Sequence, residues 1–222
     1  EFNLTSISTY SENDIIYSYD GDWGNNNFWS NSPYNWNNEN PYYAYYGAWE
    51  FKDITNRNRT SYSQEFRLKR KLKNNLTITS GLYISQLNEE DYRDGWLFAG
   101  YAQNINSTFD ISNYAIYNKL SYPISNKLII SSTLRYDYNL TKQDLNYLNN
   151  GTMGSYINEI KDKNLIGGNI KLNYKYDDFT FLNASVSRGY KTAGINQTQA
   201  PFLSDSLKIY NTEFCNNIDI GA

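Results

Sequence analysis

The 222-residue sequence contains no histidine and a single cysteine, Cys215. Without histidine the chain has no Ser-His-Asp or Cys-His nucleophilic apparatus and no histidine-based metal site. Because Cys215 stands alone, it cannot form a disulfide within the chain. We therefore predict that the chain is not an enzyme and that it holds no catalytic residues, metal or cofactor.

Long apolar runs and an excess of one charge are also missing. No stretch approaches 18 consecutive apolar residues, so a membrane-spanning helix is excluded, and no basic segment precedes an apolar core as in a secretory signal. The 20 basic and 23 acidic residues give a net charge of −3, which creates no overall field that attracts nucleic acid. We interpret the one basic run, residues 67–73, as a strand end with a lumenal and an interfacial face.

Tyrosine is abundant instead. The sequence has 23 Tyr, and aromatic residues make up 17% of it. Tyr, Trp and Thr favour strands, whereas Asn, Asp and Gly favour turns. A disordered polar chain would lack so many aromatic residues. The composition therefore predicts β-structure with long polar connections.

Eight segments alternate apolar and polar residues, as β-strands with two different faces do. In one of them Tyr62, Phe66 and Leu68 share a face, and Glu65 and Arg67 lie on the other. The eight expected strands lie near residues 2–17, 60–70, 76–84, 111–124, 128–138, 166–176, 181–191 and 213–220.

The connections between these strands indicate the architecture. Short turns near residues 72–75, 125–126 and 177–178 alternate with long connections at about 20–56, 88–110, 140–164 and 192–211. Transmembrane barrels alternate periplasmic turns and extracellular loops in this way, and their apolar strand faces end in aromatic girdles. A soluble β-sandwich is the alternative, since it also buries one strand face.

We therefore predict an all-β fold, namely an antiparallel transmembrane β-barrel present as a partial segment of about eight strands with long extracellular loops and short periplasmic turns. The sequence is expected to be part of a longer protein, because Glu1 opens in mid-pattern and Ala222 directly follows a strand-like segment.

The most specific stretch is ASVSRGYKTAGIN at residues 184–196, an alternating strand that runs into a glycine-punctuated loop. Leu182, Val186 and Tyr190 are expected on its apolar face. Gly189 and Gly194 lack the Lys-Ser/Thr of a phosphate-binding loop. We expect these glycines to relieve backbone strain where the strand leaves the sheet.

This stretch resembles the Y-A-S-V-S-x-G-Y-K-x-G-G-x-N signature of TonB-dependent outer-membrane receptors, with Ala193 where that family often has Gly. Other stretches resemble the same family in order along the chain: L-T-S-I-x-x-Y at residues 4–10, S-Q-E-x-R-L at 63–68 and G-x-R-Y-D at 133–137, where Thr133 replaces Gly. The positions that carry the family motifs are Gln64, Glu65, Arg67, Arg135, Tyr136, Gly189, Tyr190, Lys191, Gly194 and Asn196.

The resemblance implies that residues 1–222 form part of a receptor β-barrel domain in the outer membrane of a Gram-negative bacterium, without its plug domain and remaining strands. It implies import of a scarce nutrient, most often a ferric siderophore. The partners would be outer-membrane lipid, an iron-siderophore or similar small ligand, and the TonB–ExbB–ExbD complex through a TonB box that lies outside this sequence, but no nucleic acid. A passive porin and an outer-membrane barrel enzyme remain alternatives.

Ligand recognition is expected in the aromatic loops, because Trp and Tyr offer large contact areas with polar tips. The candidates are Trp23, Trp29, Trp36, Tyr43, Tyr45 and Trp96. Alternatively, these residues pack the loops against each other and the lipid interface. The acidic cluster of residues 89–91 lacks the spacing of a calcium loop, and we interpret it as solvated loop charge.

Overall fold

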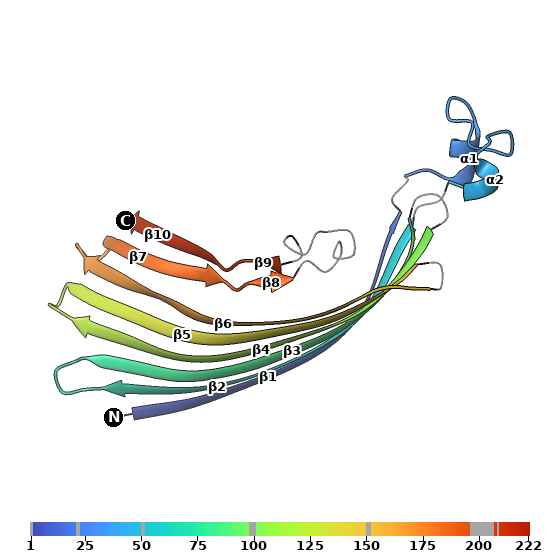
Figure 1. Cartoon of the computed structure of the whole chain (residues 1–222). Helices are drawn as coiled ribbons and strands as arrows, with labels where there is room; N and C mark the ends of the chain where they lie inside the picture. The colour runs from blue at the N-terminus through green and yellow to red at the C-terminus, as the bar shows by residue number, and fades with distance from the viewer. Residues whose placement is uncertain are drawn as a thin grey trace.

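The computed structural model describes residues 2–20, 23–49, 52–97, 101–149, 152–195, 207 and 209–222. Eight antiparallel strands form one sheet in the order β1-β2-β3-β4-β5-β6-β7-β10, so the predicted strand count is confirmed. The strands are β1 (Phe2–Asp20), β2 (Lys52–Lys71), β3 (Thr77–Leu97), β4 (Tyr101–Pro123), β5 (Leu128–Asn149), β6 (Thr152–Lys175), β7 (Phe181–Lys191) and β10 (Glu213–Gly221). Figure 1 shows that the sheet is strongly curved, and its strand order does not close on itself.

Four short elements lie outside this sheet: helices α1 (Asn26–Ser30) and α2 (Tyr43–Tyr46), and the strands β8 (Gly194–Ile195) and β9 (Ile209–Tyr210), which pair with each other. Neither helix of the described residues is long or apolar enough to cross a membrane. Both helices lie at the end of the sheet opposite the two chain termini (Figure 1).

The end that holds the termini also holds three tight turns, whose polar side chains satisfy the backbone. Asn75 adopts a left-handed conformation with φ 62° between β2 and β3. The Ser125 hydroxyl accepts hydrogen bonds from the backbone N–H groups of Lys127 and Leu128 between β4 and β5. Asp177 does the same for Phe179 and Thr180 between β6 and β7. Such turn chemistry is the reason that these connections are readable from sequence.

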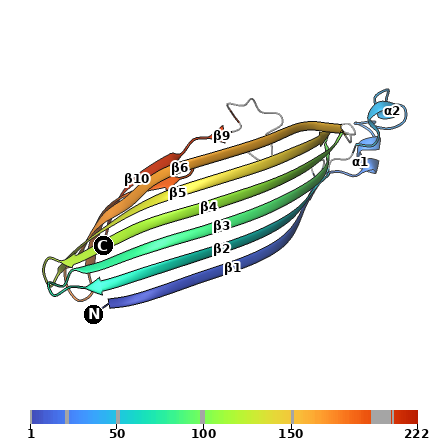
Figure 2. The ribbon, with the colours of Figure 1, turned by 60° about the horizontal axis from the view of Figure 1, so that its bottom comes forward.

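Two of the four long connections were predicted wrongly. Residues 88–97 continue β3 and residues 101–110 begin β4; similarly, residues 140–149 continue β5 and residues 152–164 belong to β6. The strands therefore extend much further than the segments that alternate apolar and polar residues. Figure 2 shows β1 to β6 running side by side along this whole length.

The two faces of the sheet differ as predicted. The outer face carries Phe66, Leu82, Ile116, Tyr136 and Ile166, which form one row of cross-strand neighbours from β2 to β6. All five are exposed; Ile116, for example, keeps 56% of its surface accessible. Apolar side chains exposed in a continuous band are stable when lipid covers them.

Tyrosines border this band at both ends on the outer face. Tyr114 and Tyr138 are direct cross-strand neighbours with ring centroids 6.4 Å apart, and Tyr122 and Tyr174 lie near the tight turns. Along β4, the stretch from Tyr114 to Tyr122 covers about nine residues, which is the length that a tilted strand needs to cross a bilayer. Beyond Tyr114 the outer face becomes polar, so the strands rise out of the bilayer on the loop side.

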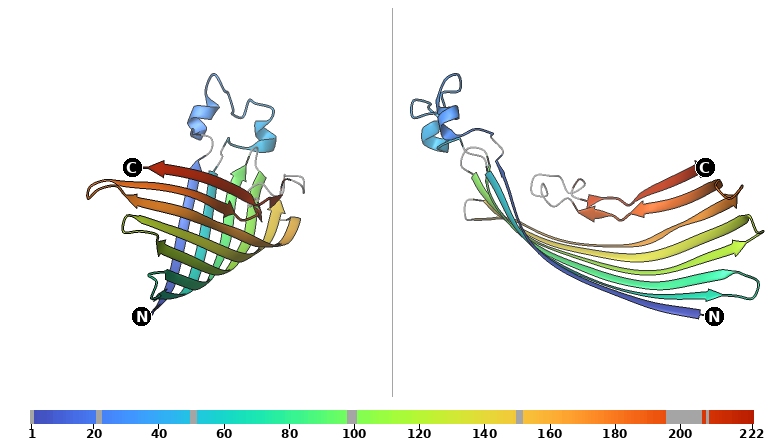
Figure 3. Two further views of the ribbon diagram at one scale, coloured as in Figure 1. Left: turned by 90° about the vertical axis from the view of Figure 1, so that its left-hand side faces the viewer. Right: turned by 180° about the vertical axis from the view of Figure 1, so that it is seen from behind.

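The inner face is concave. In the left view of Figure 3, the sheet curves so that β7 and β10 lie across the concave side of the longer strands. The segment after β7 also reaches this face, because the hydroxyl of Thr192 donates a hydrogen bond of 3.0 Å to Asn139 of β5. Leu145, Gln143 and Thr141 of β5 are almost fully buried there.

Candidate functional site

Three strands meet in a polar cluster on the inner face. The guanidinium of Arg67 on β2 donates to the carboxylate of Glu65 and to the hydroxyl of Tyr117 on β4, and Tyr117 in turn donates to Glu65. Gly81 lies between them on β3, where a Cβ atom would collide with the Tyr117 ring. The missing side chain therefore lets Tyr117 reach across β3 to β2.

A second cluster continues the first toward β7. Arg135 on β5 makes two hydrogen bonds of 2.8 Å to the carboxylate of Asp137, and its guanidinium lies 5.4 Å from the centre of the Tyr83 ring. The hydroxyl of Tyr190 donates to the same carboxylate. Asp137 is thus held from two strands by an ion pair and a hydroxyl, which makes the inner wall a connected polar surface.

The predicted position of Tyr190 was wrong. It was expected on the apolar face with Leu182 and Val186, but its hydroxyl contacts Asp137 on the inner face. The cause is that β7 pairs with β6 only from Phe181 to Arg188. Beyond Arg188 the strand is free of β6, and the Tyr190 ring lies over Gly167, where no side chain stands in its way.

A groove of about 840 Å³ lies on the inner face toward the tight turns. Its lining includes the cationic side chains of Arg67, Lys69, Lys119 and Arg135 and the single carboxylate of Glu65. The basic run 67–73 therefore does place charge on a lumenal face, as interpreted. A surface of this kind favours hydrated and anionic solutes over apolar ones.

The motif positions separate into two groups. Glu65, Arg67, Arg135 and Tyr190 come together on the inner face, whereas Gln64 and Tyr136 point outward, where they bond to Ser6 and Asn164 respectively. Lys191 lies above the Tyr210 ring and 3.8 Å from Glu213. Asn196 lies outside the described residues.

The two motif glycines, Gly189 and Gly194, were expected to relieve backbone strain, and this expectation was wrong. Among the described glycines, only Gly47 has a positive φ. A Cβ atom at Gly189 would meet nothing within 4 Å, while one at Gly194 would collide with the Tyr210 ring. Gly194 is therefore required for a close approach, and Gly189 has no steric requirement.

A ladder of ion pairs joins β2 and β3 on the inner face beyond the bilayer. Arg57 makes a bidentate contact with Asp91, Arg59 pairs with Glu89, and Arg93 pairs with Asp53. The hydrogen bond with Asp91 raises the pKa of Arg57 above its usual value. Glu89 and Asp91 were interpreted as solvated loop charge, but Glu89 is only 5% exposed. These paired charges hold the polar strand extensions together.

The described part of the β1–β2 connection, residues 23–49, is a small aromatic domain at the loop end. Trp29, Trp36 and Trp49 pack with centroid distances of 5.0 to 5.7 Å, and Tyr34 lies 4.7 Å from Trp29. The indole N–H of Trp36 donates to the carbonyl of Gly47, and the side chain of Asn25 caps α1. Its only charged residue is Glu39.

The candidate ligand-binding aromatics therefore occupy different settings. Trp29 and Trp36 contribute to the packing of this domain, whereas Trp23 is 84% exposed at its edge. Tyr43 lies half-buried in α2. The side chains of Tyr45 and Trp96 lie outside the described part. No group of three or more His, Cys, Asp or Glu side chains is placed to hold a metal ion within the described residues.

Sequence reasoning missed several members of the inner-face clusters. Tyr83 and Tyr117 were given no role, and Asp137 was noted only as the last residue of the G-x-R-Y-D motif. Their signal was the register: Glu65 and Tyr83 are cross-strand neighbours, as are Ala115 and Asp137. Small residues beside large polar ones mark such clusters, but only once the strands have been aligned.

Comparison with known proteins supports the geometry. Residues 2–221 match the sequence profile of a family described as TonB dependent receptor-like, beta-barrel. A search of curated proteins by sequence finds no match.

Solved structures share the fold at low sequence identity. The chain is similar to the ferric yersiniabactin uptake receptor FyuA from Yersinia pestis, with a TM-score of 0.65 and 15% identity over 77% of this chain and 27% of that one. It is similar to the siderophore receptor PiuA from Acinetobacter baumannii, with a TM-score of 0.65 and 9% identity over 99% and 35% of the two chains. The ferric-catecholate import receptor Fiu from E. coli K12 gives 0.55 and 11% over 77% and 29%. The chain thus spans only about a third of these structures.

Proposed function

The chain belongs to the TonB-dependent receptor family, and we propose that it forms part of the wall and the surface of a receptor that imports an iron complex, most readily a ferric siderophore. The family places it in the outer membrane of a Gram-negative bacterium. The observation that carries the proposal is the contrast between the two sheet faces: an apolar outer band bordered by Tyr114 and Tyr122, and an inner face of connected charges. A wall with these faces separates lipid from a hydrated passage.

In this proposal the cationic groove around Arg67 and Arg135 lines the passage. Many iron chelates are anionic, and a wall of fixed cations attracts them over a distance set by the ionic strength. The barrel performs no chemistry on the iron complex. Energy would come from a TonB–ExbB–ExbD complex acting on a plug domain.

The aromatic domain of residues 23–49 is proposed as part of the recognition surface. Trp23 offers its ring to a ligand, while Trp29, Trp36 and Trp49 hold the domain in shape. Tyr43, Tyr45 and Trp96 remain proposed contacts. Aromatic faces with polar surroundings suit the planar and hydroxylated groups of iron chelators.

Uptake of radiolabelled iron by cells that carry the full-length receptor tests this function. Iron is supplied as a ferric catecholate, a ferric hydroxamate or ferric citrate, to strains with and without TonB. We expect TonB-dependent uptake of one class and a loss of about tenfold in affinity in the Trp23→Ala variant, because an exposed stacking ring contributes about 1–2 kcal/mol. Uptake without TonB would favour the passive porin, and no uptake of any class would reject iron import.

A further inference from the structure

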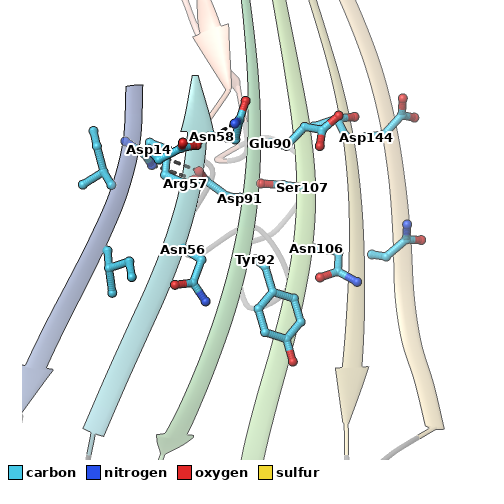
Figure 4. Close-up of a pocket in the computed structure, with 14 residues that line it drawn as sticks. Asp14, Asn56, Arg57, Asn58, Glu90, Asp91, Tyr92, Asn106, Ser107 and Asp144 are labelled. Atoms are coloured by element: carbon cyan, nitrogen blue, oxygen red, sulfur yellow. Dashed lines mark hydrogen bonds and ion pairs between the residues drawn. The ribbon is translucent and has the colours of Figure 1, made fainter. Parts of the chain in front are cut away.

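The outer face carries a depression of about 440 Å³ on the strand extensions beyond the bilayer. Figure 4 shows the side chains that line it. Two neighbouring cross-strand rows build its floor. One row is Asn56, Tyr92, Asn106 and Asn146 on β2 to β5, and the other is Asp14, Asn58, Glu90, Thr108 and Asp144 on β1 to β5. We propose that this depression binds uncharged sugar units of the glycolipid in the outer leaflet of the membrane.

The chemistry of the lining favours a hydroxyl-rich, uncharged ligand. Side-chain amides both donate and accept hydrogen bonds, carboxylates accept them from hydroxyl groups, and an aromatic ring packs against the C–H face of a sugar. The lining contains four asparagines, one tyrosine and four carboxylates, and its single cation, Arg57, is engaged by one of these carboxylates, Asp91, on the inner side. A phosphate group would find no free cation there.

The polar groups of the first row are available for binding. Asn58 donates a hydrogen bond of 2.7 Å to Asp14 within the second row. Within the part of the chain that the structure describes, no hydrogen bond is made by the side chains of Asn56, Tyr92, Asn106 or Asn146. In Figure 4, Asn56, Tyr92 and Asn106 project from neighbouring strands on the same side of the sheet.

The position of the depression selects a membrane glycolipid as the source of these sugars. The depression lies on the same outer face as the apolar band, which is covered by lipid. The polar part of the outer face connects the two. Along β4, Thr108 and Asn106 lie six to eight residues beyond Tyr114. At about 3.4 Å per residue and a tilt of about 40°, this is roughly 15–20 Å beyond the tyrosine border. At this height the neighbour of the outer wall is the sugar layer of the outer leaflet.

The test uses the full-length receptor extracted from its native membrane. A triple variant, Tyr92→Ala with Asn106→Ala and Asn146→Ala, removes the first row. The matched control, Thr55→Ala with Asn113→Ala, makes similar truncations on the inner face of β2 and β4. After identical detergent washing, mass spectrometry measures the glycolipid retained per receptor. We expect equal retention in wild type and control and at least a fivefold loss in the triple variant.

Retention in the triple variant equal to that in wild type would overturn the proposal. The triple variant is replaced by Asn106→Trp if it fails to assemble, as judged by the heat-dependent gel mobility of folded barrels. The larger side chain fills the depression, so undiminished retention in the Asn106→Trp variant also overturns the proposal.

A second experiment uses oligosaccharide freed from the lipid by mild acid. If wild type binds it through the first row while glycolipid retention is unchanged in every variant, the site serves free saccharide and the assignment to membrane lipid is wrong. Iron uptake is measured in parallel and is expected to be unchanged, so this result is independent of the proposed function.

Discussion

Tyr190 and Tyr136 have the same side chain in the same sheet, yet their surroundings differ. The Tyr190 hydroxyl donates to the carboxylate of Asp137, whose side chain is only 4% exposed, whereas that of Tyr136 donates to the exposed Asn164 on the outer face. Hydrogen bonds to a buried charged group contribute more than those at the surface. We expect Tyr190→Phe to lower the free energy of unfolding by about 1–2 kcal/mol and Tyr136→Phe by less than about 0.5 kcal/mol.

Urea unfolding of the full-length receptor in detergent, followed by tryptophan fluorescence, measures both values. Equal effects of the two substitutions would show that the contact between Tyr190 and Asp137 does not stabilise the wall. Alternation along β7 predicted the position of Leu182 and Val186 but not that of Tyr190, which lies where β7 still pairs with β10 but no longer with β6. Gly167 of β6 was the available signal, since its missing side chain leaves room for the Tyr190 ring.

Two glycines of this sheet, Gly168 and Gly189, differ in whether the structure has space for a Cβ atom. A Cβ atom at Gly168 would collide with the backbone carbonyl oxygen of Thr133, which cannot rotate away, whereas one at Gly189 would meet nothing. We expect Gly168→Ala to destabilise the receptor by about 1–3 kcal/mol and Gly189→Ala to change its stability by less than about 0.5 kcal/mol. The same unfolding experiment compares them. A large effect at Gly189 would show that this motif position has a role that its surroundings do not reveal.

At the scale of elements, the strand extensions beyond the bilayer depend on paired charges. Glu89 faces inward between Arg57 and Arg59, while its neighbour Glu90 faces outward. We expect Glu89→Ala to speed amide hydrogen exchange in residues 53–60 and 88–93, because it leaves two guanidinium groups without this partner, and to leave residues 62–70 unchanged. Glu90→Ala is the control, and equal exchange in the two variants would contradict the structural role of the ladder.

The length of these strands was the main error of the sequence-based prediction. Alternation of apolar and polar residues identified the bilayer-crossing parts, such as residues 60–70 and 128–138, because only there do the two faces meet different surroundings. Beyond the bilayer both faces are polar, and residues 88–97 look like a loop. The cross-strand partners Arg57 with Asp91 and Arg59 with Glu89 reveal the strand, but only after the register is known.

The turn between β6 and β7 provides a prediction about pH. Asp177 accepts hydrogen bonds from the backbone N–H groups of Phe179 and Thr180 at 2.9 and 2.7 Å, and these bonds hold the pKa of Asp177 below its usual value. A carboxyl group whose pKa is lowered by folding stabilises the folded state above its unfolded pKa of about 3.9, and this contribution disappears as the pH falls through the folded pKa. We expect the stability difference between wild type and Asp177→Ala to be constant near neutral pH and to shrink below about pH 4. Unfolding of both proteins at a series of pH values measures this stability difference. A difference that does not change with pH would show that the ionised carboxylate of Asp177 does not stabilise the turn.

At the scale of the whole molecule, sequence and structure agree on the architecture. The three short turns, the two sheet faces and the eight strands were predicted from residue patterns. Two of the four expected long connections are instead mostly strand. The site was harder to predict, because the clusters around Glu65 and Asp137 and the depression at Asn106 combine residues from several strands. Each depends on register, which a single sequence does not display.

The open sheet itself predicts how this chain behaves alone. Each edge strand, β1 and β10, has one hydrogen-bonded neighbour among the described strands, so both present unpaired backbone groups along their other side. Unpaired edges template association with other chains. Residues 1–222 refolded in detergent are expected to form concentration-dependent oligomers. The full-length receptor is expected to sediment as a monomer, because strands outside these residues would cover both edges. Analytical ultracentrifugation over a tenfold range of protein concentration distinguishes the two. A monomer that unfolds cooperatively at every concentration would show instead that the curved sheet protects its own edges.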